Sequence, residues 1–202
     1  RTAFPANVSK VSRHSLAQCP QTGKTYVADA ERGLFVRDGL MSLILDEAPC
    51  SAVALQPDSD RIAYLTRKGE LQIRENQESP SITLAEGNAN ALAWGTDATL
   101  FVAQQDGSIA AWDTTNQVKR CSVSVKKGIR KLDYCQKASL LAIAEHRGKV
   151  KLFDANLRLE AEFQANTGLL QDCSFSPDGK RLAVAFDDVG VIWDIENLVE
   201  IN

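Results

Sequence analysis

A short motif that returns about every 40 residues is the feature of this chain that most restricts its fold. An acidic residue closes a short alternating segment at Asp38, Glu75, Asp113, Asp154 and Asp194, at intervals of 37 to 41 residues along the 202-residue chain. Self-similarity at this period indicates repeated supersecondary units that stack on one another. The strand-like content of each unit favours β-propeller blades over a helical solenoid.

Each unit carries the same order of parts, which the second unit shows clearly. A short apolar segment at 52–55 is followed by a polar turn at 56–60 that contains Pro and Asp, residues suited to tight turns. A continuous apolar run at 62–65 is typical of a strand buried on both faces. The alternating segment 71–73 and the more polar segment 82–84 complete the unit. The sequence therefore predicts four antiparallel strands per unit.

The predicted fold class is all-β, with about five four-stranded blades. Residues 1–13 form an N-terminal segment and a candidate closing strand. The blades are assigned to approximately 14–48, 49–87, 88–127, 128–168 and 169–202.

Two of these units resemble WD40 repeats. The segments 172–185 with 191–194, and 106–113, carry the resemblance, and Trp-Asp pairs occur at Trp112-Asp113 and Trp193-Asp194. In the unit between them, Phe153-Asp154 stands at the position of the Trp-Asp pair. The resemblance implies structural roles for these six residues. The WD40 family also places a Gly-His pair upstream, and this sequence has none, which makes the chain a divergent member of that pattern.

The resemblance implies a larger ring, most often of seven blades, so five units predict an incomplete one. Three ways of completing the ring remain open. The rest of the protein can supply the missing blades, a partner chain can add strands by β-augmentation, or residues 1–13 can close a small ring of five.

No catalytic, metal or cofactor site is expected from the sequence. It contains no phosphate-binding Gly loop, no HExxH motif and no nucleophile elbow. The only histidines are His14 and His146, and His146 lies in a charged turn. The carboxylates Glu160 and Glu162 fall on one face of a predicted strand, which we interpret as a solvated face. The five cysteines are widely spaced and odd in number, so we expect reduced thiols and an intracellular protein of the cytoplasm or nucleus.

Basic residues gather on one predicted face of the blades. Turns between second and third strands share this face with the connections between blades. The residues concerned are Arg32, Arg67, Lys68, Lys126, Lys127, Arg130, Lys131 and Arg147. Since Arg and Lys clusters bind carboxylates and phosphates, we predict a docking site for an acidic or phosphorylated segment.

The sequence therefore predicts a non-catalytic scaffold for protein–protein interaction, within a larger complex. This function follows from the resemblance and from the missing chemistry. One alternative is a propeller enzyme with a site in its central channel, although the expected first strands are apolar. Another is weak nucleic-acid binding through the basic face, but the net charge is −3 and aromatic residues are scarce there.

Overall fold

The computed structural model describes residues 14–125, 128–165 and 168–201. These segments contain strands and turns but no helix, so the described residues include no helix that could cross a membrane. Five four-stranded antiparallel sheets follow one another along the chain, each made of four consecutive strands. This architecture confirms the predicted all-β fold of four-stranded blades. The predicted Lys126, Lys127 and the candidate closing strand at 1–13 lie outside the described residues.

The strand bounds follow in chain order. The first two sheets comprise β1 His14–Gln18, β2 Thr25–Asp29, β3 Gly33–Asp38, β4 Met41–Asp46, β5 Cys50–Leu55, β6 Ile62–Thr66, β7 Leu71–Arg74 and β8 Ile82–Ala85. The third and fourth comprise β9 Ala89–Trp94, β10 Thr99–Gln104, β11 Ser108–Asp113, β12 Val118–Ser124, β13 Ile129–Cys135, β14 Leu140–Glu145, β15 Lys149–Phe153 and β16 Leu159–Gln164. The fifth comprises β17 Leu170–Phe175, β18 Arg181–Phe186, β19 Gly190–Asp194 and β20 Val199–Glu200.

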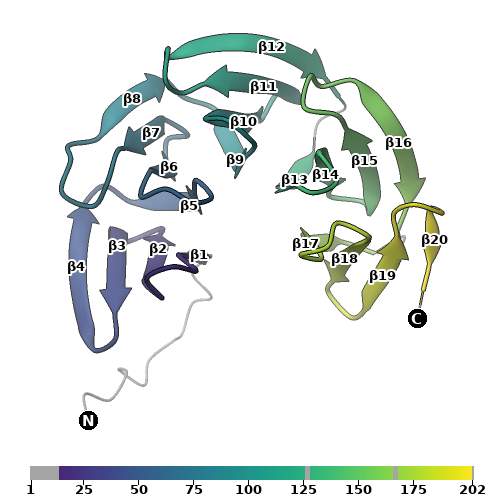
Figure 1. Cartoon of the computed structure of the whole chain (residues 1–202), viewed down its shortest axis with the longest axis horizontal. Coiled ribbons are helices and arrows are strands. Elements are labelled where there is room, and N and C mark those ends of the chain that lie inside the picture. Colours follow the sequence, from purple (N-terminus) through teal and green to yellow (C-terminus); the bar gives the residue numbers. More distant parts are fainter. Residues whose placement is uncertain (1–13, 126–127, 166–167, 202) are drawn as a thin grey trace.

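The sheets stand side by side as blades along an open arc (Figure 1). First strands line the inner side of the arc and fourth strands its outer side. Each first strand contacts the first strand of the next blade, from β1 and β5 to β13 and β17. The described residues therefore form five blades around a shared axis, and a ring of seven stays a prediction.

The second strands show why continuous apolar runs are needed. In β6, Ile62 and Tyr64 pack toward the first blade, whereas Ala63 and Leu65 pack toward the third. All four side chains are fully buried. Burial of one such large aliphatic side chain stabilises the fold by roughly 2 kcal/mol. A strand with neighbours on both faces has no solvated side, so the alternation typical of exposed sheets is absent.

Polar links also join neighbouring blades. The backbone N–H of Val53 donates to Ser15 Oγ at 3.2 Å, and the N–H of Phe175 donates to Asp133 Oδ2 at 2.7 Å. Arg61 donates through Nη1 to Thr114 Oγ1 at 2.8 Å. Each link pairs a side chain of one blade with a group of the adjacent blade, which fixes the register of the stack.

The two edges of the arc carry different kinds of turn. We call the edge with the turns between second and third strands, and the connections between blades, the connection rim. The opposite edge carries the turns between first and second and between third and fourth strands, and we call it the hairpin rim. This division follows from the antiparallel strand order in every sheet. Each candidate functional residue can therefore be assigned to one of the two rims.

Candidate functional site

Four of the predicted basic residues are exposed on the connection rim. Arg32, Arg67, Lys68 and Arg147 lie in turns between second and third strands. Among the described residues, no side chain forms an ion pair or hydrogen bond with any of the four side chains. Their positive charges are thus available to a partner.

Arg130 and Lys131 differ, because both are engaged by the fifth blade. Arg130 Nη2 donates to Gln171 Oε1 at 2.9 Å, and Lys131 Nζ lies 3.2 Å from Asp172 Oδ1. Gln171 in turn donates to Asp187 Oδ1. These two predicted docking residues therefore also join the fourth blade to the fifth.

Acidic side chains share the connection rim with the basic ones. They include Glu31, Glu70, Asp106, Asp187 and Asp188. The connection rim therefore carries both positive and negative charges. Attraction of an acidic segment depends on local pairs of basic side chains rather than on a uniform positive potential. The adjacent Arg67 and Lys68 form such a pair.

The turn that carries Arg67 and Lys68 is held from both sides. The N–H of Arg67 donates to Pro49 O at 2.7 Å, and the N–H of Gly69 donates to Thr66 O at 2.9 Å. Gly69 O accepts from the N–H of Ala89 at 3.1 Å. The turn is therefore tied to the connections before and after its own blade. A partner that binds the two side chains has little backbone to order.

The acidic residues of the repeat motif cap turns on the hairpin rim. Asp113 accepts the N–H groups of Thr115 and Asn116, both at 3.0 Å. Asp154 and Asp194 accept backbone N–H groups in the same place of their own blades. A short acidic side chain is well suited to this Asx-turn geometry.

The aromatic partners of these aspartates pack between strands and blades. Trp112 packs against the cluster between the second and third blades, and Phe153 lies in the cluster between the third and fourth. Trp193 stacks on Phe163 of the preceding blade. The six repeat-motif positions thus lie in packing and turn contacts.

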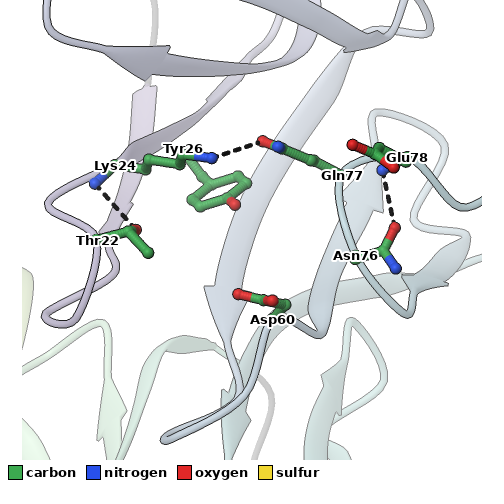
Figure 2. Close-up of a pocket in the computed structure, with 7 residues that line it drawn as sticks. All are labelled: Thr22, Lys24, Tyr26, Asp60, Asn76, Gln77 and Glu78. Atoms are coloured by element: carbon green, nitrogen blue, oxygen red, sulfur yellow. Dashed lines mark hydrogen bonds between the residues drawn. The ribbon is translucent and has the colours of Figure 1, made fainter.

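A polar pocket opens on the hairpin rim between the first two blades (Figure 2). The turn β1–β2 contributes Thr22 and Lys24, β2 contributes Tyr26, the turn β5–β6 contributes Asp60, and the turn β7–β8 contributes Asn76, Gln77 and Glu78. The volume is about 260 Å³. Lys24 Nζ donates to Gln77 Oε1 at 3.3 Å and bridges the two blades above the Tyr26 ring.

The sequence did not predict this pocket, because the pattern around each lining residue also fits a core position or a polar turn. Tyr26 lies in an apolar strand and is 5% exposed, so its pattern indicates a core residue. Asp60 and Glu78 lie in polar turns, where acidic residues are common. Burial raises the pKa of Tyr26, and the nearby Asp60 carboxylate raises it further. The only available signal was the coincidence of polar turns in two consecutive blades.

The face of the fifth blade that points away from the fourth blade forms an apolar hollow. It has a volume of about 370 Å³ and includes Ala183, Ala185 and Ile192. The matching alanines of the fourth blade, Ala142 and Ala144, are fully buried against the fifth blade. Ala183 and Ala185 are exposed instead. The fifth blade therefore presents an interblade packing surface with no neighbour among the described residues.

Titratable and metal-binding side chains form few clusters in the described part of the chain. No group of three or more His, Cys, Asp or Glu side chains that could hold a metal ion occurs among the described residues. Glu145 and Lys151 form an ion pair of 2.6 Å on neighbouring strands of the fourth blade, with both side chains about nine-tenths buried. The five cysteines carry free thiols. The surfaces with accessible chemistry are thus the basic turns, the polar pocket and the apolar hollow.

Comparison with known proteins gives a family match and a structural match. The family model of the anaphase-promoting complex subunit 4 WD40 domain matches residues 132–198. A chain in a crystal structure of the mitotic checkpoint complex superposes with a TM-score of 0.79 at 15% identity. That alignment covers 93% of this chain and 62% of the other. At this identity the likeness shows the fold alone.

Two curated sequences are similar over much of the chain. Telomerase protein component 1 of Rattus norvegicus is 28% identical over 222 aligned residues, covering 96% of this chain and 8% of that protein. The Mus musculus protein of the same name is 27% identical over 168 residues, covering 74% of this chain and 6% of that protein. The chain thus spans less than a tenth of the length of these relatives.

Proposed function

We propose that this chain, a run of five WD40-type β-propeller blades, works as a non-catalytic docking module within a larger intracellular complex. The observation that carries the proposal is the exposed Arg67-Lys68 pair on a turn fixed by backbone hydrogen bonds to both neighbouring connections. Arg32 lies in the corresponding turn of the first blade and Arg147 in that of the fourth.

A fixed turn favours binding because little conformational entropy is lost when a partner contacts it. Binding requires the immobilisation of flexible groups, and a rigid frame reduces that cost. Charged groups at an interface rim chiefly set the association rate and the choice of partner. An acidic or phosphorylated segment of a partner protein would meet Arg67 and Lys68 without any refolding of the blade.

The comparisons support membership in an assembly. The family match and the structural match both carry the names of multiprotein complexes, and the curated relatives are named as a telomerase component. Scaffold folds host many functions, so these names support a role in an assembly but identify no partner.

The test compares charge reversal on the two rims in the full-length protein. Arg67→Glu with Lys68→Glu reverses the proposed docking pair, and Lys137→Glu with Lys180→Glu reverses two exposed lysines on the hairpin rim as a matched control. Partners recovered with each tagged protein from cells are quantified by mass spectrometry. We expect the first variant to lose its main partner about tenfold and the control to retain it. Equal recovery by both variants would contradict docking at Arg67 and Lys68.

We also propose that a further blade covers the apolar hollow of the fifth blade. The exposed Ala183 and Ala185 support this proposal, because their counterparts Ala142 and Ala144 are covered by the large apolar residues of the next blade. The same packing rule predicts Leu, Val or Phe in the second strand of the covering blade. The rest of the protein or a partner chain would supply it.

A further inference from the structure

The polar pocket between the first two blades lies on the rim opposite the proposed docking pair. Its volume of about 260 Å³ falls below the range of pockets for drug-sized ligands, which begins at about 300 Å³. A pocket of this size matches one long side chain of a partner better than a free cofactor. Its lining is built by three turns and one strand, so the pocket exists only where two blades meet (Figure 2).

The charges of the lining favour a cation. Asp60 and Glu78 contribute two carboxylates, and Lys24 contributes one ammonium group that already donates to Gln77. Neither carboxylate accepts a hydrogen bond or forms an ion pair with any described residue. The lining therefore carries one negative charge in excess, which a single positive charge would neutralise.

Tyr26 provides a second and independent indication of a ligand. Its side chain is 5% exposed, it lines the pocket, and its ring lies between the Lys24–Gln77 bridge and Asp60 (Figure 2). No hydrogen bond joins its hydroxyl to any described residue. A phenol hydroxyl that lines a pocket without a protein hydrogen bond is available to a ligand, because it can accept from one donor and donate to one acceptor. A donor that enters the pocket would supply that bond.

We infer that this pocket binds an arginine side chain of a partner protein. The guanidinium group is planar and carries five N–H donors, so it suits a lining that offers carboxylates and a hydroxyl as acceptors. An anion would be repelled by the two carboxylates, and the described residues form no cluster suited to a metal ion.

The inference is tested by NMR titration of the ¹⁵N-labelled chain with two capped tripeptides. One is acetyl-Gly-Arg-Gly-amide, and the other replaces arginine by citrulline, which has nearly the same shape but no charge. We expect the arginine peptide to shift the amide signals of Tyr26, Asp60 and Gln77, and to bind at least about fivefold more tightly than the citrulline peptide. Equal binding of the two peptides, or no shift at these residues, would overturn the inference.

Point variants then assign the binding to the pocket. Asp60→Asn and Glu78→Gln each remove one exposed carboxylate, and we expect each to weaken binding about three- to fivefold. The control is Asp58→Asn, in the same turn as Asp60 but hydrogen-bonded to Gln21 and outside the lining. Weakening by the control as large as that by Asp60→Asn would refute a specific pocket.

A failure of arginine binding at the pocket can be distinguished from a failure of partner docking at Arg67 and Lys68. Arg67→Glu with Lys68→Glu changes the opposite rim and should leave the affinity for the arginine peptide unchanged. Loss of arginine binding in that variant would contradict the assignment to the hairpin rim. Retained arginine binding beside unchanged partner recovery would support the pocket and reject the docking pair.

Discussion

Trp193 stacks on Phe163 across the boundary between the last two blades, with ring centroids 4.2 Å apart and planes at 25°. The indole Nε1 of Trp193 is buried and has no hydrogen-bond partner among the described residues. The tryptophan of this repeat thus serves packing, while its polar atom is unsatisfied. This agrees with the absence of the Gly-His pair that the WD40 pattern places upstream.

The first prediction concerns this indole. Trp193→Phe removes the unsatisfied N–H and keeps an aromatic ring against Phe163, so the free energy of unfolding should change by less than about 1 kcal/mol. Trp193→Ala removes the stack and should cost about 2–3 kcal/mol. Urea unfolding of both variants provides the measurement. A loss in the Phe variant as large as in the Ala variant would show that the N–H has a partner after all.

The second prediction concerns the pH dependence of stability at Asp113. Hydrogen bonds from the N–H and side chain of Asn116, together with Arg120, hold the pKa of Asp113 below its usual value. A group whose pKa is lowered on folding stabilises the protein above its unfolded pKa of roughly 4. That stabilisation is lost as the pH falls toward the lower folded value.

The experiment compares wild type with Asp113→Asn by thermal unfolding between pH 3 and pH 7. Wild type should be the more stable protein above about pH 5, and the difference should shrink below about pH 4. Glu160→Gln, on the exposed strand β16, is the control and should show no such trend. A difference between wild type and Asp113→Asn that is independent of pH would reject a charge contribution from Asp113.

The third prediction tests the fixed turn below the proposed docking pair. Gly69 has a φ of +80°, and an added Cβ would lie 2.7 Å from Asn88 N and 2.8 Å from Ala89 N. Gly69→Ala should therefore cost about 2–4 kcal/mol through backbone strain and the lost contact with the next connection. Gly39→Ala, at φ +56° with open space around it, should cost only about 1 kcal/mol. Equal costs would mean that the turn is not held against its neighbours.

The fourth prediction tests the missing neighbour of the fifth blade. In the 202-residue chain, Ala144→Glu buries a charge between blades and should cost at least about 3 kcal/mol, whereas Ala185→Glu should be nearly neutral. In a longer protein that supplies the proposed covering blade, both variants should be strongly destabilising, because that blade would cover Ala185. An equally neutral Ala185→Glu in the longer protein would reject that covering blade.

The fold could be predicted in large part because its physical signals are local. A second strand with neighbours on both faces must be apolar at successive positions, as in 62–65, and tight turns require Pro, Asp or Gly. The expected first strand at 52–55 was too short, since β5 runs from Cys50 to Leu55. The strand continues through a register shift between Cys50 and Ala52, which an apolar pattern does not reveal.

The candidate sites were predicted less completely because they depend on contacts between blades. Arg130 and Lys131 were predicted as part of the docking site, and the sequence did not reveal that Gln171 and Asp172 of the next blade bind them. The polar pocket joins turns from two blades, and Tyr26 has the sequence pattern of a core residue. Such contacts bring together residues about one repeat apart, so no local pattern marks them.

Hydrogen exchange of the chain, alone and with a decapeptide of alternating glutamate and phosphoserine, tests the docking account most directly. The account predicts slower exchange on binding in the turn 66–70, with unchanged exchange in the buried strands β6, β10 and β14. Binding without any change in that turn, or with altered exchange throughout these strands, would contradict a fixed frame that docks its partner through Arg67 and Lys68.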